Sequence, residues 1–74
     1  MTRLRTITSR ELCKKLKKLG FIMIRQKGSH TFWRHNDGRC TVVPIHKGED
    51  IGKGLFRSIL NEIQMEVEEF EKVK

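Results

Sequence analysis

The sequence predicts a small α+β domain in which a three-stranded antiparallel sheet carries helices on one face. Three observations support this fold class. The 74 residues suffice for one domain only, a helical pattern of leucines precedes three short β-type segments, and the turns between those segments are too short to connect parallel strands. A second helical pattern and a final short helix follow, so the predicted order is α-β-β-β-α-α. We treat residues 1–74 as a single domain.

The first predicted element is a helix that begins at Glu11 or Leu12 and ends before Gly20. Thr8 or Ser9 precedes it, and a hydroxyl side chain at this position caps a helix N-terminus. Leucines at positions 12, 16 and 19 recur at helical spacing, and glycine commonly follows a helix end. We expect the outer face of this helix to carry four lysines, Lys14, Lys15, Lys17 and Lys18.

Three β-strands are predicted next, over Phe21–Gln26, His30–His35 and Arg39–Ile45. β-Branched and aromatic residues favour strands in these segments. Residues 27–29 form the first turn, and the Asn-Asp-Gly sequence at residues 36–38 is a strong hairpin signal. Turns this short join antiparallel neighbours, so the three strands form a meander.

Side-chain alternation places Phe32 and Trp33 on opposite faces of the second strand. Only one of these aromatic rings is therefore free to stack on a base. We expect Arg25, His30 and Arg34 to lie toward solvent because their side chains are polar or charged. In the first strand, alternation predicts two opposed sets of residues: Phe21, Met23 and Arg25 against Ile22, Ile24 and Gln26.

The second half of the chain is predicted to be helical after a polar loop over His46–Lys53. Apolar residues at positions 55, 59, 60 and 63 give the segment Gly54–Ile63 one apolar face. A short acidic helix is expected over Met65–Val73, and we expect its glutamates to point away from the basic part of the chain. With the helices on one face of the sheet, the other face stays open.

The charge is divided unevenly along the chain. Sixteen Lys and Arg against nine Asp and Glu give a net charge of +7. Residues 1–47 hold twelve basic and two acidic side chains (+10), and residues 48–74 hold four basic and seven acidic ones (−3). This division indicates a protein that meets a polyanion on one side, with nucleic acid as the first partner to consider and a membrane surface as the second.

No apolar run approaches the roughly 20 residues of a membrane span, and two cysteines without a signal-peptide pattern favour a cytoplasmic protein.

His30 is the candidate catalytic residue. It follows a Gly-Ser turn, Arg25 and Lys27 precede it, and no acidic residue lies within several positions. Histidine exchanges protons near neutral pH, and RNA cleavage needs a base for the 2′-OH proton together with cations beside the phosphate. A strand histidine that donates to a backbone carbonyl is the other interpretation, and spacing alone does not separate the two.

A metal site is not predicted. Its candidate ligands are His30, His35, Cys40 and His46, and they lack the paired spacings of zinc sites. The exception is the pair His30 and His35, which point to opposite faces of one strand. Cys40 also lacks the surroundings that activate a nucleophilic thiol. We therefore expect neither a metal nor another cofactor.

Basic side chains with few acidic neighbours predict contacts to RNA phosphates in the first part of the chain. The candidate RNA-binding or phosphate-binding residues are Arg25, Lys27, Ser29, Lys14, Lys18, Arg34 and His46. An ordinary solvated helix face is the other interpretation of the lysines.

A series of short motifs runs through the chain in a recognisable order. They are Gly20-Phe21, Arg25-Gln26-Lys27-Gly28-Ser29-His30, Asp37-Gly38-Arg39, Val42-Val43-Pro44-Ile45-His46 and Gly54-Leu55-Phe56-Arg57-Ser58-Ile59-Leu60. In order and spacing the sequence resembles the HicA (YcfA-like) family of small mRNA-cleaving toxins from Leu12 to Phe70. One departure is Gln64, which stands where the resemblance leads us to expect a glycine.

The resemblance implies a fold similar to the double-stranded-RNA-binding domain and a ribosome-independent endoribonuclease that cleaves mRNA and arrests growth. It makes His30 the catalytic histidine. Our mechanistic hypothesis is that His30 acts as general acid and base without a metal, that Lys27 and Arg25 hold the scissile phosphate, and that Ser29 offers a hydroxyl or backbone N–H. The resemblance also implies a HicB-like antitoxin as the partner that covers the site, and operator DNA as a target of the toxin–antitoxin complex.

Two other function classes remain open from the sequence. One is a non-catalytic RNA-binding module with a double-stranded-RNA-binding-domain-like fold, although the start of the second helix offers only Lys53 and Arg57 for duplex phosphates. The other is an interaction protein whose basic face serves only an acidic partner. Fragments of mRNA, rather than a shifted band, distinguish the enzyme from both.

Overall fold

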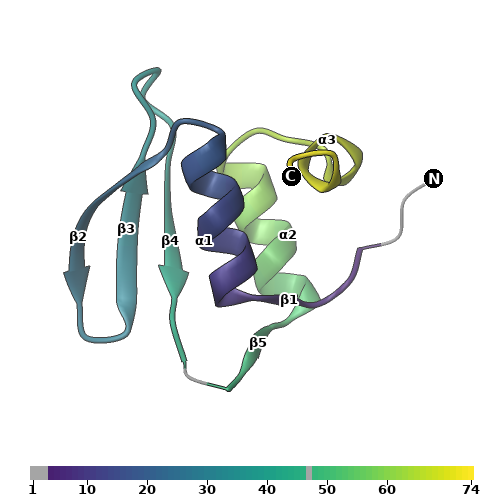
Figure 1. The fold of residues 1–74 in the computed structure, drawn as a ribbon, viewed down its shortest axis with the longest axis horizontal. Helices are drawn as coiled ribbons and strands as arrows, with labels where there is room; N and C mark the ends of the chain where they lie inside the picture. The colour runs from purple at the N-terminus through teal and green to yellow at the C-terminus, as the bar shows by residue number, and fades with distance from the viewer. Residues whose placement is uncertain (1–3, 47) are drawn as a thin grey trace.

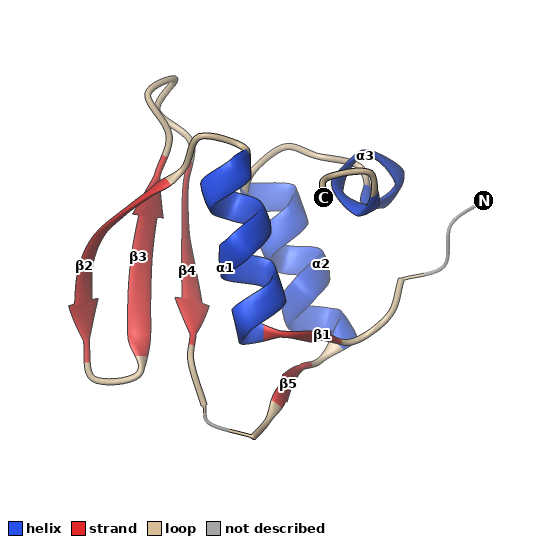
Figure 2. Cartoon of the chain, viewed as in Figure 1, coloured by secondary structure: helices blue, strands red, loops and turns tan. Residues whose placement is uncertain are grey.

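The computed structural model describes residues 4–46 and 48–74, and its elements follow the predicted order with two short strands added (Figures 1 and 2). The elements are β1 (Ile7–Thr8), α1 (Ser9–Lys18), β2 (Ile22–Lys27), β3 (His30–Arg34), β4 (Cys40–Pro44), β5 (Asp50–Ile51), α2 (Lys53–Glu62) and α3 (Val67–Glu71). The antiparallel sheet has the strand order β2-β3-β4, with the helices on one face. The predicted α+β class is confirmed, and the architecture is consistent with a double-stranded-RNA-binding-domain-like fold.

The register of the sheet differs from simple alternation in β2. Ile22 lies opposite Arg34, and Arg25 lies opposite Phe32, with a bulge between Met23 and Arg25. Directly opposed residues in an antiparallel pair project to the same face, so Ile22 and Arg25 share the open face with Phe32 and Arg34. The predicted separation of Ile22 from Arg25 is therefore wrong, because the extra residue of the bulge reverses the alternation along the strand.

The core lies between the helices and the inner face of β3 and β4. Trp33 is buried there, so Phe32 is the aromatic residue left on the open face. The polar atoms that accompany Trp33 into the core are bonded: its Nε1 donates to Thr31 Oγ1 at 2.9 Å, and Thr31 Oγ1 donates to the carbonyl of Val43 at 2.7 Å. Apolar side chains of the helices complete this layer, among them Leu12, Leu16, Phe56, Ile59 and Leu60.

Both long helices begin and end within a few residues of their predicted positions. Thr8 caps α1, because its Oγ1 accepts a hydrogen bond from the Glu11 amide at 3.0 Å. Each helix is followed by a residue with positive φ, Gly20 at 99° after α1 and Gln64 at 58° after α2. The same pair of hydrogen bonds closes both ends: Phe21 N to Leu16 O and Gly20 N to Lys17 O after α1, and Met65 N to Leu60 O and Gln64 N to Asn61 O after α2. Both ends are thus Schellman motifs.

A second, two-stranded sheet joins residues before α1 to part of the predicted loop His46–Lys53. Ile7 of β1 pairs with Ile51 of β5, and both side chains are buried in the core. This pairing ties the segment before α1 to the segment before α2. Two-residue strands are too short to show periodicity, so the sequence offered no signal for them.

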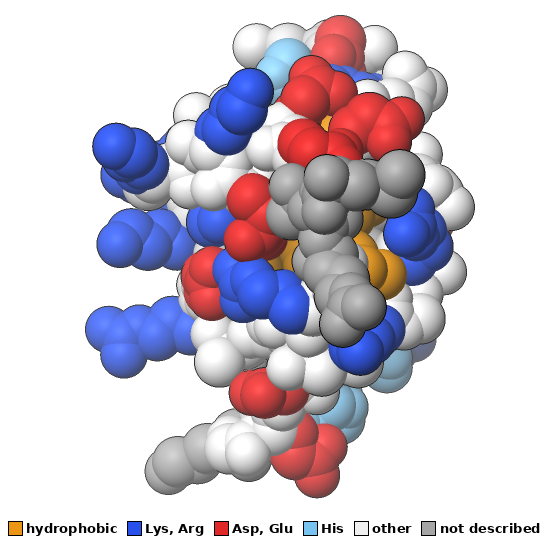
Figure 3. All heavy atoms as spheres, turned by 90° about the vertical axis from the view of Figure 1, so that its right-hand side faces the viewer, with side chains coloured by type: hydrophobic (Ala, Val, Ile, Leu, Met, Phe, Trp, Pro, Cys, Tyr) orange, Lys and Arg blue, Asp and Glu red, His pale blue; other side chains and the backbone are white. Residues whose placement is uncertain are grey.

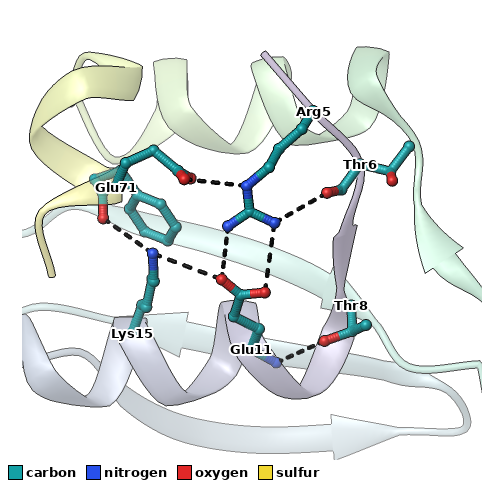
Figure 4. Close-up of polar contacts among 7 residues, drawn as sticks. Arg5, Thr6, Thr8, Glu11, Lys15 and Glu71 are labelled. Atoms are coloured by element: carbon teal, nitrogen blue, oxygen red, sulfur yellow. Dashed lines mark hydrogen bonds and ion pairs between the residues drawn. The ribbon is translucent and has the colours of Figure 1, made fainter. Parts of the chain in front are cut away.

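The face that α1 turns toward α3 carries charged residues (Figure 4). Lys15 was predicted on the outer face, and this prediction is wrong: it is only 8% exposed, with Nζ 3.5 Å from the Phe70 carbonyl and 3.6 Å from Glu11 Oε2. Glu71 likewise points inward, where its Oε2 accepts a hydrogen bond from Arg5 Nε at 3.0 Å. The fold therefore uses these charges to attach α3 to α1 and to the first residues of the described chain.

Candidate nucleic-acid interface

The turn between β2 and β3 is held in place from two directions. Gly28 adopts a φ of 59°, a left-handed conformation that glycine takes without steric cost. The side-chain amide of Gln26 donates to the Gly28 carbonyl at 3.0 Å, and the Ile45 amide donates to the Ser29 carbonyl at 2.6 Å. The turn is thus fixed to the segment that follows β4.

His30 is the first residue of β3 and lies at this end of the open face. It is opposite Lys27 of β2 on one side and Pro44 of β4 on the other. Its side chain is exposed and makes no hydrogen bond or ion pair with any of the residues 4–46 and 48–74. The imidazole is therefore available to a ligand, with a lysine side chain beside it.

Further cations continue along the same face. Arg25 lies with its guanidinium 4.4 Å from the centroid of the Phe32 ring, a distance typical of a cation–π contact. Arg34 is two residues beyond Phe32 and is exposed. The predicted positions of Arg25, His30 and Arg34 toward solvent are confirmed, and Phe32 is partly accessible between them.

A second basic group lines a groove between α1 and the end of β4. Its lining residues are Ser9, Arg10, Cys13, Lys14, Lys17 and Ile45. Ile45 also bonds the Ser29 turn, so the groove adjoins the end of the sheet that carries His30. Of the two lysines predicted here, Lys14 lines the groove and Lys18 lies outside it, on the exposed part of α1.

Arg10 is a groove residue that the sequence prediction missed, and Lys17 was predicted only as one of four lysines on the outer face of the helix. With Lys14 they occupy positions i, i+4 and i+7 of α1, a spacing that places all three on one helix face. That spacing was a usable signal, but it does not show which face lies beside β4. Figure 3, seen from the side that carries α3, shows basic side chains projecting at the edge where α1 lies and acidic side chains gathered over α3.

His46 occupies a less favourable position for an anion. It lines a hollow with Arg10 but also with Glu49 and Asp50. Carboxylates that line the same hollow offset the attraction that Arg10 exerts on a phosphate. The predicted residues therefore divide into those gathered on the open face, those along the α1 groove, and His46 between acidic neighbours.

His35 has a structural position that distinguishes it from His30. Its Nδ1 accepts a hydrogen bond from the Asp37 amide at 3.1 Å and also lies 3.1 Å from Asp37 Oδ1. The ring also packs edge-on against Phe21, with centroids 5.1 Å apart. The chain thus uses His35 to fix the hairpin between β3 and β4 against the core.

The two cysteines lie in different surroundings. Burial raises the pKa of the Cys13 thiol, and Cys40 is exposed. Among residues 4–46 and 48–74, no three His, Cys, Asp or Glu side chains are grouped closely enough to hold a metal ion. None of the helices in this part of the chain is long and apolar enough to cross a membrane.

Comparison with known proteins identifies the family. No curated protein matches the chain. The sequence model of the HicA toxin of bacterial toxin–antitoxin systems matches residues 9–65, a segment that begins with α1, contains the whole three-stranded sheet and α2, and ends at Met65. Because this match covers most of the 74 residues and includes the turn with His30, the chain belongs to the HicA family of toxins in toxin–antitoxin systems.

Proposed function

We propose that this toxin is an endoribonuclease that cleaves mRNA with His30 as its general acid and base and without a metal ion, and that it thereby inhibits translation and growth. The observation that carries the proposal is the position of His30. Its unbonded imidazole lies at the open end of the sheet, opposite Lys27 and on the face that carries Arg25. Glu49 and Asp50 lie instead beside His46, whereas Glu62 lines a hollow with Arg25 and Phe32.

This arrangement suits strand cleavage by the RNA's own 2′-hydroxyl. His30 takes the 2′-OH proton, the 2′ oxygen forms a bond to phosphorus, and the P–O5′ bond breaks. The electron pair of that bond leaves with the 5′ oxygen, which takes a proton from a bridging water, and His30 acts as the general acid by returning its proton to that water. The products are a 2′,3′-cyclic phosphate and a free 5′-hydroxyl.

Cations beside the imidazole lower the barrier by stabilising the charge that develops on the phosphate. Lys27 is assigned this role because it is directly opposite His30, with Arg25 two residues away on the same strand and Ser29 offering its hydroxyl or backbone N–H at the turn. Longer RNA contacts are assigned to Arg34 on the open face and to Lys14 in the α1 groove. Lys18 and His46 complete the proposed contacts at the margins of this surface.

The test is the His30→Ala variant, incubated with total mRNA. Removal of a general base typically costs 10²- to 10⁴-fold in rate, so we expect fragment formation to fall by about that factor. Since the His30 side chain is exposed and unbonded, the free energy of unfolding should change by less than about 0.5 kcal/mol and RNA affinity should be nearly unchanged. Cleavage by this variant at the wild-type rate would show that His30 is not the catalytic group.

The matched control is His35→Ala. This change removes the contact with Phe21 and the acceptor for the Asp37 amide, so it should lower the free energy of unfolding by about 1–2 kcal/mol. Cleavage should persist at temperatures where the variant is folded.

Full activity in excess EDTA is expected for both wild type and control, and its loss would indicate a metal-dependent reaction. RNA binding without any fragments would favour the non-catalytic module.

A further inference from the structure

The outer edge of the sheet, strand β2, is exposed along its whole length. Among the described residues β2 pairs with β3 alone, and all six residues of β2 are exposed. The helices lie over the other edge of the sheet, beside β4 (Figure 1). Three consecutive residues with large apolar side chains are consequently left in solvent: Ile22 is 61% exposed, Met23 44% and Ile24 58%. Ile22 lies on the open face, and Met23 lies on the opposite face because it pairs with Trp33.

Strand edges in natural proteins are usually protected by charges or bulges. In β2 this protection is confined to one half, where Arg25 and Lys27 follow the bulge. The other half presents Ile22 and Ile24, which line a hollow together with Arg34. An apolar patch of this kind, with arginine at its rim, has the composition of a protein-binding site.

We propose that β2 is the docking edge for the antitoxin. An extended antitoxin segment pairs with β2 as a fourth strand, a known mode of peptide recognition. Its apolar side chains cover Ile22 and Ile24, and its carboxylates face Arg25 and Arg34. The proposal rests on membership of a toxin–antitoxin family and not on the catalytic role of His30.

Charge decides between an acidic partner and a second copy of this chain. Each copy carries a net charge of +7, and pairing two β2 edges would bring Arg25, Lys27 and Arg34 of both copies together. Self-repulsion of this kind opposes association. An acidic segment meets the same three cations with opposite charge.

Docking on β2 also explains how a partner blocks the proposed active site without replacing any catalytic group. Lys27 and Arg25 belong to β2 itself, and Lys27 lies opposite His30. Carboxylates placed along this strand occupy the cations that the RNA phosphate requires. Inhibition then follows from competition for the same side chains.

The first test measures binding of the antitoxin that relieves growth arrest when it is co-expressed with this chain. In the double variant Ile22→Thr with Ile24→Thr, β-branched strand formers are kept while apolar surface is removed. We expect its Kd for the antitoxin to rise by about 30-fold or more. The control is Leu55→Gln, which changes a 41% exposed apolar residue on α2 and should change Kd by less than threefold. Equal effects of both variants, or no effect of the double variant, would overturn the proposal.

Growth provides a second readout that does not depend on the chemistry of killing. The double variant should remain toxic and should no longer be neutralised by the co-expressed antitoxin. A toxin that acted by some reaction other than RNA cleavage would still show this escape, so the outcome separates this proposal from the proposed function. A toxic double variant that is fully neutralised would contradict docking on β2.

Hydrogen exchange of the wild-type complex tests the strand pairing itself. Amide protons of β2 should exchange more slowly in the complex than in the free toxin. Protection that appears only on other elements would overturn the proposal. Sedimentation of the toxin alone should give a monomer, and a dimer that the double variant abolishes would assign β2 to self-association instead.

Discussion

At the scale of single residues, the surroundings of each histidine determine its role. His30 begins β3 and His35 directly follows it. His30 is exposed and makes no hydrogen bond or ion pair within residues 4–46 and 48–74, whereas His35 accepts a hydrogen bond and packs on Phe21. His46 differs again because Glu49 and Asp50 line its hollow. The sequence identified His30 by its basic neighbours and the preceding Gly-Ser turn, but the availability of its imidazole depends on what the rest of the chain leaves uncovered.

Gln64 is a second residue whose surroundings lead to a prediction. It occupies a left-handed conformation, φ 58°, at the end of α2, which costs a side-chain-bearing residue roughly 1–2 kcal/mol. Glycine avoids this cost but loses more entropy on folding. We expect Gln64→Gly to raise the free energy of unfolding by roughly 0.5–1 kcal/mol, measured by urea denaturation.

The matching residue after α1 provides the reverse experiment. Gly20 has φ 99°, and a Cβ placed there would lie 3.1 Å from His35 Nε2. Gly20→Ala should therefore destabilise the protein by at least about 1 kcal/mol. If Gln64→Gly instead lowered the free energy of unfolding, the left-handed backbone at residue 64 would not be what limits stability at the end of α2.

At the scale of elements, α1 has two charged faces with different uses. One lines the groove beside β4, and the other carries Glu11 and Lys15 toward α3. Glu11 Oε2 lies 2.6 Å from Arg5 Nη2, and the same arginine bonds Glu71 (Figure 4). The hydrogen bond from Arg5 is the largest cause that lowers the pKa of Glu11 below its usual 4.5, and the burial of Glu11 opposes it.

The lowered pKa of Glu11 predicts how the free energy of unfolding depends on pH. A carboxyl whose folded pKa lies below its unfolded value stabilises the fold above the unfolded pKa, and this contribution is lost as the pH falls through the folded pKa. The free energy of unfolding should therefore decrease as the pH falls below about 4.5. Urea denaturation at several pH values should show a smaller decrease for Glu11→Gln. The control Glu49→Gln alters an exposed loop carboxylate outside the Arg5 network and should retain the wild-type slope. Identical slopes for both variants would exclude Glu11 as the source.

The sheet shows which features of an element are predictable from local sequence. The strands and their antiparallel order followed from apolar segments and short turns. The bulge in β2 did not, because the number of residues opposite each partner depends on pairing with β3. As a result, alternation correctly predicted which side chains of β3 share a face, but it could not predict this for β2.

At the scale of the whole molecule, the uneven charge along the chain becomes an uneven surface. The basic segment forms the open sheet face and the α1 groove. The acidic segment contributes α3, over which acidic side chains gather (Figure 3). Single-stranded RNA affinity should fall with salt, with a slope in log–log form of about −0.7 per phosphate contacted. The double variant Lys14→Gln with Lys17→Gln should reduce the magnitude of this slope by about 1.4.

This measurement uses the His30→Ala background so that the RNA stays intact. Lys53→Gln at the start of α2 is the control, because Lys53 lies outside the groove and its loss should leave the slope unchanged. A reduction with Lys53→Gln but none with the α1 variant would instead place RNA against α2, as in a duplex-binding module.

The sequence by itself determined the fold class, the ends of both long helices and the turn that presents His30 among cations. These features depend on periodicity, caps and glycines, which act between residues a few positions apart. Only the tertiary structure decided that Lys15 faces inward, that Arg10 and Lys17 border a groove, and that β2 is left uncovered. The physical reason is that exposure is set by what packs against a residue. The helices cover β4 but stop short of β2, and they leave exposed a strand whose first three residues are as apolar as those of a buried strand.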